Sequence, residues 1–223
     1  MINTVIFDLD NTLVNRKRAI ETFSEKFIDH FIDIPNPADK PEIVRYFIEA
    51  DQDGYRGKKV FFQDLLENLK WKKEAAYQEL LDYWEAEFYV HTQLMDGAED
   101  VLQFLKSRGL TLGLITNGTV YAQNFKIDHV GIRHWFDSIV VSDEVQVNKP
   151  DRKIFEIALE RLEARPEASV YIGDHPLNDM KGAQDAGLKT IWLEGFRVWD
   201  LPDVQPHRKI RDLRELIQIF GED

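Results

Sequence analysis

Residues 4–12 read TVIFDLDNT, a short run of β-branched and aromatic residues that ends in two acids, an amide and a hydroxyl. Such an apolar run is typical of a strand buried on both faces of a sheet. Side chains two residues apart on an extended chain point the same way, so Asp8 and Asp10 are expected to share one site past the strand end. Asn11 tolerates the unusual backbone angles of a sharp exit. Taken alone, the stretch is equally typical of a turn whose side chains cap backbone amides.

The same pattern returns four times later in the chain, and helical patterns accompany it. The predicted strands are Thr4 to Phe7, Thr111 to Ile115, Ser138 to Val141, Ser169 to Ile172 and Lys189 to Leu193. The predicted helices are Gly97 to Arg108, Asp151 to Leu162, Asn178 to Ala186 and Asp212 to Phe220. Apolar runs that alternate with amphipathic helices indicate an α/β fold, a Rossmann-like parallel sheet covered on both faces.

The stretch between the first and second predicted strands is far too long for an ordinary crossover. It shows helical patterning rich in aromatic residues, with proline and glycine breaks, and no convincing strand. We therefore expect an inserted all-helical cap domain of about four helices at residues 17–95. Residues 1–16 and 96–223 would form the α/β core domain, with hinges near Asn15 to Arg18 and Gln93 to Gly97.

The composition excludes several classes of function. Lys and Arg number 28 against 40 for Asp and Glu, a formal charge of -12, which disfavours binding to a nucleic-acid polymer or an anionic membrane. The chain has no cysteine, so thiolate catalysis and zinc-thiolate sites are excluded. No apolar stretch approaches the length of a membrane span. We expect a cytoplasmic protein, and the sequence leaves open whether it is a monomer or a homodimer.

Polar side chains follow the predicted strands where ligands bind in open parallel sheets. They are Thr116 and Asn117, Lys149, and Asp174 to Asp179. Carboxylates are ligands that Mg²⁺ prefers, while hydroxyl, amide and lysine groups can hold phosphate oxygens. Each feature alone has a simpler explanation, namely a strand-end turn, a solvated lysine, or an acid near a helix N-terminus. His175 is a possible substrate contact.

Together these residues resemble the haloacid dehalogenase-like (HAD) superfamily, whose four motifs occur here in the right order. The matching residues are Asp8-Leu9-Asp10-Asn11-Thr12, then Thr116, then Lys149, and finally Gly173-Asp174 followed by Asp179. The resemblance covers the core domain, and its specificity comes from the four motifs jointly.

The resemblance implies a role for each matched residue. Asp8 would be the nucleophile that becomes an aspartyl phosphate, and Asp10 the general acid and then base. Thr116 and Lys149 would bind the transferring phosphoryl group. Mg²⁺ would be bound by Asp8, the backbone carbonyl of Asp10, and Asp174. Thr12 and Asp179 would be supporting residues.

The position of the insertion resembles the subfamily with phosphoglycolate phosphatase, β-phosphoglucomutase, 2-haloacid dehalogenase and several nucleotidases. Haloacid dehalogenases lack the second acid of the first motif, so Asp10 favours phosphoryl transfer. The resemblance implies a Mg²⁺-dependent phosphatase acting on a small phosphorylated metabolite or nucleotide. The alternatives are a phosphomutase of the β-phosphoglucomutase type and a non-catalytic HAD-like binding protein.

Contacts to substrate are also predicted. Asn117 would help Thr116 to hold phosphate oxygens. Arg56, with Tyr55 and Lys58 beside two glycines, would belong to a substrate-specificity loop of the cap. An exposed turn between helices is the alternative for that loop.

Overall fold

The computed structural model describes residues 1–221 and divides into two compact units. The core unit comprises Met1–Asn15 and the chain from Leu94 onward, and the inserted unit is Arg16–Gln93. Each unit has a hydrophobic core of its own. Within the described chain, no helix combines the length and apolarity needed to cross a bilayer.

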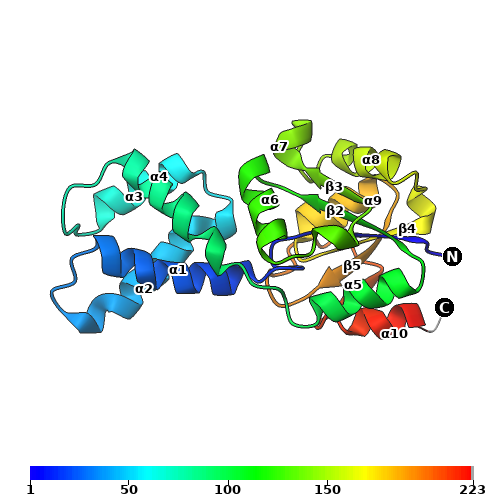
Figure 1. Cartoon of the computed structure of the whole chain (residues 1–223), viewed down its shortest axis with the longest axis horizontal. Coiled ribbons are helices and arrows are strands. Elements are labelled where there is room, and N and C mark those ends of the chain that lie inside the picture. Colours follow the sequence, from blue (N-terminus) through cyan, green and yellow to red (C-terminus); the bar gives the residue numbers. More distant parts are fainter. Residues whose placement is uncertain (222–223) are drawn as a thin grey trace. The chain divides into compact units, whose positions relative to one another are not determined.

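The core unit is built on six parallel strands, which confirms the predicted α/β fold (Figure 1). They are β1 (Thr4–Phe7), β2 (Thr111–Thr116), β3 (Ser138–Val141), β4 (Ser169–Gly173), β5 (Lys189–Leu193) and β6 (Arg208–Ile210). Their order in the sheet is β3-β2-β1-β4-β5-β6. The chain runs outward from β1 through β2 and β3, then returns to add β4 on the other side of β1. Strand order therefore reverses at β1 and β4, where ligands bind in such sheets.

Strand β6 is the one strand that the sequence pattern did not predict. It has three residues, of which Arg208 and Lys209 are exposed and Ile210 is buried. It pairs with β5 at the edge of the sheet. A short edge strand with one apolar residue has no recognisable apolar run, because charged side chains are common in strands whose outer edge is exposed to solvent.

Helices cover both faces of the sheet. They are α5 (Ala98–Ser107), α6 (Val120–His129), α7 (Ser142–Val145), α8 (Arg152–Arg161), α9 (Gly182–Asp185) and α10 (Glu215–Gly221), with a π-helical turn η6 (Pro176–Lys181) and 3₁₀ turns η4 (Arg133–Trp135) and η5 (Pro166–Ala168). Val5 and Phe7 pack in one apolar cluster with residues of α5 and α10, while Ile6 packs in another with residues of α8 and α9. Alternate side chains of β1 thus face opposite layers of helices.

Two helices begin at least two residues away from their predicted starts, and two others, α6 and α7, were not predicted. The segment predicted from Asn178 begins earlier, because Pro176 starts the π-helical turn that leads into α9. Helix α10 begins at Glu215 rather than Asp212, since the Glu215 side chain accepts hydrogen bonds from the backbone of Arg211 and Asp212. Helix α6 follows β2, and the sequence pattern gave no sign of it.

The inserted unit contains four α-helices, the number that the sequence predicted. They are α1 (Arg16–Phe31), α2 (Lys40–Asp51), α3 (Lys58–Asn68) and α4 (Tyr77–Glu87), with 3₁₀ turns η1 (Pro37–Asp39), η2 (Gln52–Gly54) and η3 (Tyr89–His91). Its core is aromatic: Phe23 lies with its ring centroid 4.9 Å from that of Trp84, and Phe27 lies 4.9 Å from Phe47. Large aromatic side chains bury much apolar surface, which allows a unit of this size its own core.

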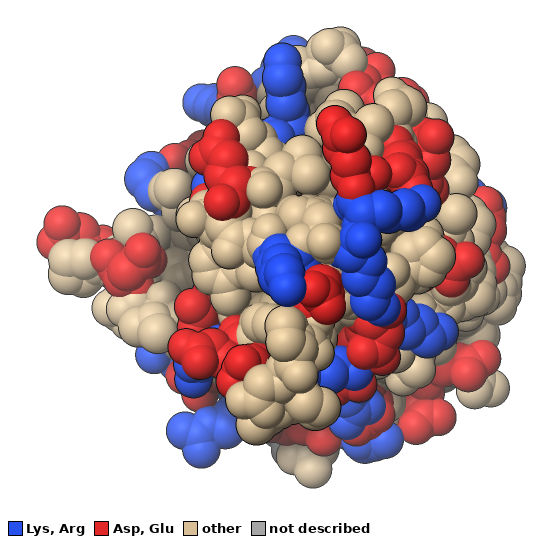
Figure 2. All heavy atoms as spheres, turned by 90° about the vertical axis from the view of Figure 1, so that its left-hand side faces the viewer, with Lys and Arg blue, Asp and Glu red and all other residues tan. Residues whose placement is uncertain are grey.

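Charged side chains of both signs are intermixed on the surface that Figure 2 presents. This face shows blue basic groups lying beside red acidic groups. Intermixed exposed charges create weak fields beyond about 8–10 Å at physiological ionic strength. Such a face therefore exerts little long-range attraction on an anion.

Candidate active site

The predicted site residues of the core unit meet at the carboxyl ends of β1, β2 and β4. Asp8 directly follows β1, Thr116 ends β2, and Asp174 directly follows β4. The Asp8 backbone N–H donates to Ile172 O at 2.9 Å, which fixes the end of β1 against β4. Asn11 adopts the left-handed conformation, with φ 59°, as its place in the sharp exit from β1 predicted.

Lys149 links two of the predicted acids. Its Nζ donates to Asp8 Oδ1 at 2.6 Å and to Asp179 Oδ1 at 2.7 Å. It also lies 3.0 Å from the Tyr171 hydroxyl oxygen, and all four side chains are buried. Burial disfavours the charged lysine, but the Asp179 and Asp8 carboxylates outweigh it and hold the pKa of Lys149 well above its usual value. Lys149 is therefore a fixed positive charge beside Asp8.

Asp8, Asp174 and Asp179 form a buried acidic cluster. One carboxylate oxygen from each lies within 4.8 Å of the others. Burial raises the pKa of Asp8 to about 7, and Lys149 offsets only part of that effect. Burial, together with the charges of Asp179 and Asp8, also raises the pKa of Asp174 well above its usual value. The cluster is thus short of positive charge, and three hard oxygen donors of this kind suit Mg²⁺.

Asp179 is held more tightly than the other two acids. Its Oδ1 accepts from Lys149 Nζ and its Oδ2 accepts from the His175 backbone N–H at 2.9 Å. Gly173 makes room for it, since a Cβ there would collide with the Asp179 carboxylate. With both oxygens already engaged, Asp179 is placed to orient Lys149, which leaves Asp8 and Asp174 as the carboxylates best placed for a metal.

The carboxylate of Asp10 lies in a different environment, against α6. Lys126 Nζ donates to its Oδ1 at 2.8 Å and to its Oδ2 at 2.5 Å, and Gln123 Nε2 donates to Oδ2 at 3.0 Å. Neither Lys126 nor Gln123 was identified from the sequence. Their spacing of three places both on one face of α6, but this spacing is informative only once the helix itself is known. The predicted metal ligand at this position is the backbone carbonyl of Asp10, not its carboxylate.

Thr116 and Asn117 lie beside this group. The Thr116 hydroxyl is buried and accepts a hydrogen bond from Gln123 Nε2. Asn117 binds the Lys149 backbone in both directions, because its Oδ1 accepts from Lys149 N at 2.9 Å and its Nδ2 donates to Lys149 O at 3.0 Å. The predicted contact of Asn117 with substrate stays a prediction; the side chain itself braces Lys149.

Thr12, His175 and Trp192 occupy supporting places. The Thr12 hydroxyl is buried and forms no hydrogen bond within the described residues. His175 Nδ1 accepts from the backbone N–H groups of Leu177 and Asn178, so the ring caps the π-helical turn, and burial lowers its pKa. Trp192 Nε1 donates to Asp174 O at 2.7 Å and thereby fixes the backbone of that acid.

Arg56 lies in the inserted unit, where Asp64 binds it. Its Nη2 is 3.2 Å from Asp64 Oδ1, and its Nη1 donates to Ala50 O at 3.3 Å. Lys58, from the same predicted loop, starts α3 and donates to the buried Asp51 at 2.7 Å. The loop is thus braced inside its own unit, and the substrate contact predicted for Arg56 stays a prediction.

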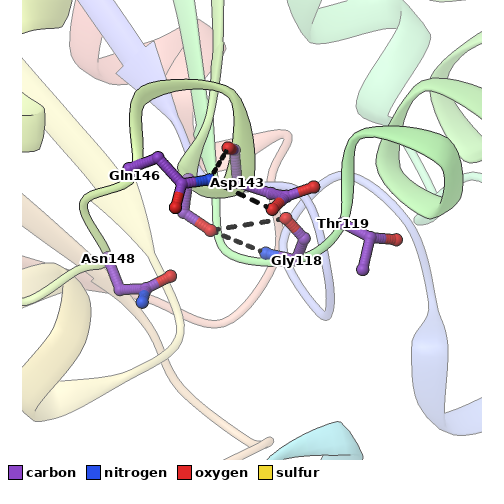
Figure 3. Close-up of a pocket in the computed structure, with 6 residues that line it drawn as sticks. Gly118, Thr119, Asp143, Gln146 and Asn148 are labelled. Carbon is purple, nitrogen blue, oxygen red and sulfur yellow. Dashed lines mark hydrogen bonds between the residues drawn. The ribbon is translucent and has the colours of Figure 1, made fainter.

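A pocket of about 290 Å³ lies next to the loops that carry Asn117 and Lys149 (Figure 3). Its lining residues are Gly118, Thr119, Ser142, Asp143, Gln146 and Asn148. A hydrogen bond from Gly118 N to Ser142 Oγ joins the two loops, and Gln146 Nε2 donates to Asp143 O within the second of them. With a carboxylate and no lysine or arginine among these six residues, the pocket does not suit an anion.

The raised pKa of Asp8 has a testable effect on stability. The pKa of the Asp8 carboxyl is about 7 in the folded protein and 3.8 in its usual state. Such a group contributes its full stabilisation below pH 3.8, and this contribution is lost as the pH rises through 7. A shift of that size corresponds to an upper bound of about 4 kcal/mol. In chelator, the melting temperature should therefore fall between about pH 5.5 and about pH 8. The fall should be smaller for Asp8→Asn, measured by thermal denaturation, and equal slopes for the two proteins would contradict the assignment.

One family model and several known proteins are similar to this chain in sequence. Residues 5–193 match the family model of the haloacid dehalogenase-like hydrolases. The glyceraldehyde 3-phosphate phosphatase of Methanopyrus kandleri is 29% identical over 100% of this chain and 98% of its own. The phosphoserine phosphatase of Thermus thermophilus is 38% identical over 120 residues, which are 53% of this chain and 48% of that protein. This chain thus matches about half the length of that relative.

Solved structures extend the match to the whole fold. The magnesium-bound structure of the HAD-hydrolase YfnB from Bacillus subtilis has a TM-score of 0.76 and 28% identity, over 99% of each chain. The family match covers well over half of the sequence and includes all four motifs. The chain therefore belongs to the haloacid dehalogenase-like hydrolase family, which confirms the resemblance that its motifs predicted.

Proposed function

We propose that this protein is a Mg²⁺-dependent phosphatase that hydrolyses a small-molecule phosphate monoester through an aspartyl phosphate on Asp8. The observation that carries the proposal is the contact between Lys149 Nζ and Asp8 Oδ1, 2.6 Å long, at the edge of a buried cluster of three carboxylates. A nucleophilic carboxylate held between cations can approach a phosphate ester without strong charge repulsion. Relatives named as phosphatases support the same chemistry.

The proposed reaction uses the two acids of the first motif in turn. An Asp8 oxygen attacks phosphorus, the ester P–O bond breaks, and Asp10 gives its proton to the leaving oxygen. Asp10, now a carboxylate, takes a proton from water, which attacks the aspartyl phosphate and releases inorganic phosphate. Thr116 and Lys149 hold the phosphoryl oxygens. Asp8, Asp174 and the Asp10 carbonyl would hold Mg²⁺, which would supply further positive charge to those oxygens.

The proposal extends to the substrate and the inserted unit. Both named relatives act on small alkyl phosphates, phosphoserine and glyceraldehyde 3-phosphate, so we place the substrate in that size class. The inserted unit would serve as the cap that selects the leaving group, as predicted from its position between the first two motifs. A phosphomutase would instead return the phosphoryl group to a sugar phosphate and release little inorganic phosphate.

Removal of the metal tests the proposal directly. Protein dialysed against a chelator should release phosphate from 4-nitrophenyl phosphate about 100-fold more slowly than protein with Mg²⁺, because several kcal/mol of charge stabilisation are lost. Adding Mg²⁺ in excess of the chelator should restore the rate, and a chelator already saturated with Mg²⁺ is the control. Undiminished release from metal-free protein, or no release under either condition, would overturn the proposal.

A further inference from the structure

Helix α6 presents two buried polar side chains to Asp10. Lys126 and Gln123 are 5% and 2% exposed, and both lie on the face of α6 that packs into the core unit. Lys126 contacts both oxygens of the Asp10 carboxylate, and Gln123 contacts one of them. The carboxylate is therefore held at two points from one helix face.

Gln123 connects this contact to the phosphoryl-binding loop. Its Nε2 also donates to the Thr116 hydroxyl and lies 3.0 Å from Asn117 O. Asp10 comes from the loop after β1, whereas Thr116 ends β2. One amide group thus links the predicted acid to the hydroxyl predicted to hold the transferring phosphoryl group.

The energetics indicate that the arrangement does more than stabilise the fold. Lysine is among the residues that are rarely buried, and an apolar residue would fill the same position of an inward helix face at no electrostatic cost. Buried ion pairs add little net stability compared with well-packed apolar side chains. Their contribution is to fix geometry, and here the group whose geometry is fixed is Asp10.

We propose that Lys126 and Gln123 are positioning residues that hold the Asp10 carboxyl group within hydrogen-bond distance of the leaving oxygen of the ester. The inference rests on the proposed phosphatase function and adds two residues that act through Asp10. Neither side chain needs to contact the phosphoryl group for this role. Small displacements of a catalytic group lower rates steeply, because proton transfer requires hydrogen-bond distance and alignment.

The choice of leaving group separates positioning of the acid from a general loss of activity. An alkyl leaving oxygen needs its proton in the transition state, whereas 4-nitrophenolate leaves readily without one. The alkyl-phosphate probe is whichever of phosphoserine and glyceraldehyde 3-phosphate the wild-type protein hydrolyses faster. With this probe, Lys126→Met should lower kcat roughly 10- to 100-fold and change KM little. With 4-nitrophenyl phosphate the loss should be only about 3-fold. Lys126→Arg should recover part of the alkyl-phosphate rate.

A second measurement tests the contact without relying on catalysis. In thermal denaturation, Lys126→Met should change the melting temperature less in an Asp10→Asn background than in the wild-type protein, because the two side chains act as a pair. Lys106→Met is the matched control. Lys106 pairs with Asp137, the residue before β3, at the amino ends of the strands, and should affect neither the leaving-group ratio nor the Asp10 coupling.

The outcomes distinguish the two proposals. Equal loss with both leaving groups, or additive effects of Lys126→Met and Asp10→Asn on the melting temperature, would overturn the positioning role while leaving the phosphatase intact. Absence of metal-dependent phosphate release from the wild-type protein would overturn the phosphatase, and the positioning role with it.

Discussion

Asp8→Asn is expected to lower kcat for phosphate release by at least about 10⁴-fold, the scale on which covalent enzymes lose activity with their nucleophile. The amide is not a nucleophile, so the aspartyl phosphate does not form. Asparagine matches aspartate in shape, and Lys149 keeps its contact with Asp179 at 2.7 Å, so the site should stay assembled. Phosphate release under saturating Mg²⁺ measures the effect.

A control and a direct observation make this result specific. Asp128→Asn makes the same chemical change at an exposed side chain paired with Arg133, near the end of α6, and should leave kcat unchanged. Acid-quenched wild-type protein, digested and examined by mass spectrometry, should carry a phosphoryl group on the peptide that contains Asp8. Retention of a tenth or more of the wild-type rate by Asp8→Asn would contradict the nucleophile assignment.

The same variant separates catalysis from folding. Replacing Asp8 removes one of three buried carboxylates, and burial, together with the charges of neighbouring acids, raises the pKa of Asp8 and of Asp174. At about pH 8 in chelator, Asp8→Asn should therefore melt at a higher temperature than the wild type, although it has lost its activity. A variant that is both inactive and less stable under these conditions would point to simple disruption of the site.

The acids of the site could be predicted because the architecture itself brings them together. Asp8 and Asp174 each follow directly after a buried strand, and parallel neighbouring strands end at the same edge of the sheet. Knowing the two apolar runs was therefore enough to place the two carboxylates side by side. Lys149 lies in a loop instead, and only the family motifs distinguished it from a solvated lysine.

The residues missed from the sequence are those whose polar groups point inward from helices and strands. Lys126 and Gln123 leave α6 with few apolar positions on its buried face, chiefly Ala122 and Ile127, so no amphipathic stripe marked the helix. Tyr171 stands between Val170 and Ile172 in a run that resembles an ordinary core strand. That its hydroxyl lies 3.0 Å from Lys149 Nζ depends on tertiary packing, which periodicity does not encode.

Lys149→Met is expected to have the second-largest effect, a loss of about 10³-fold in kcat/KM, because a preorganised charge at the transferring phosphoryl group is removed. The variant should also be destabilised in chelator by about 3–5 kcal/mol, the usual cost of removing one partner from a buried ion pair. Lys149→Arg should not restore the rate. The planar guanidinium cannot replace a point charge that two carboxylates contact at 2.6 and 2.7 Å beside a tyrosine hydroxyl.

A double variant separates the two consequences of losing Lys149. Asp179→Asn combined with Lys149→Met removes one negative charge along with the positive one, so the metal-free protein should regain much of its stability, as measured by thermal or urea denaturation. Its kcat/KM should stay as low as that of Lys149→Met, because the positive charge beside Asp8 is still absent. Lys106→Met, at an exposed ion pair with Asp137, should change neither quantity. Recovery of activity together with stability in the double variant would show that Lys149 only balances the charge of the cluster, whereas stability without activity requires its ammonium group in the phosphoryl transfer itself.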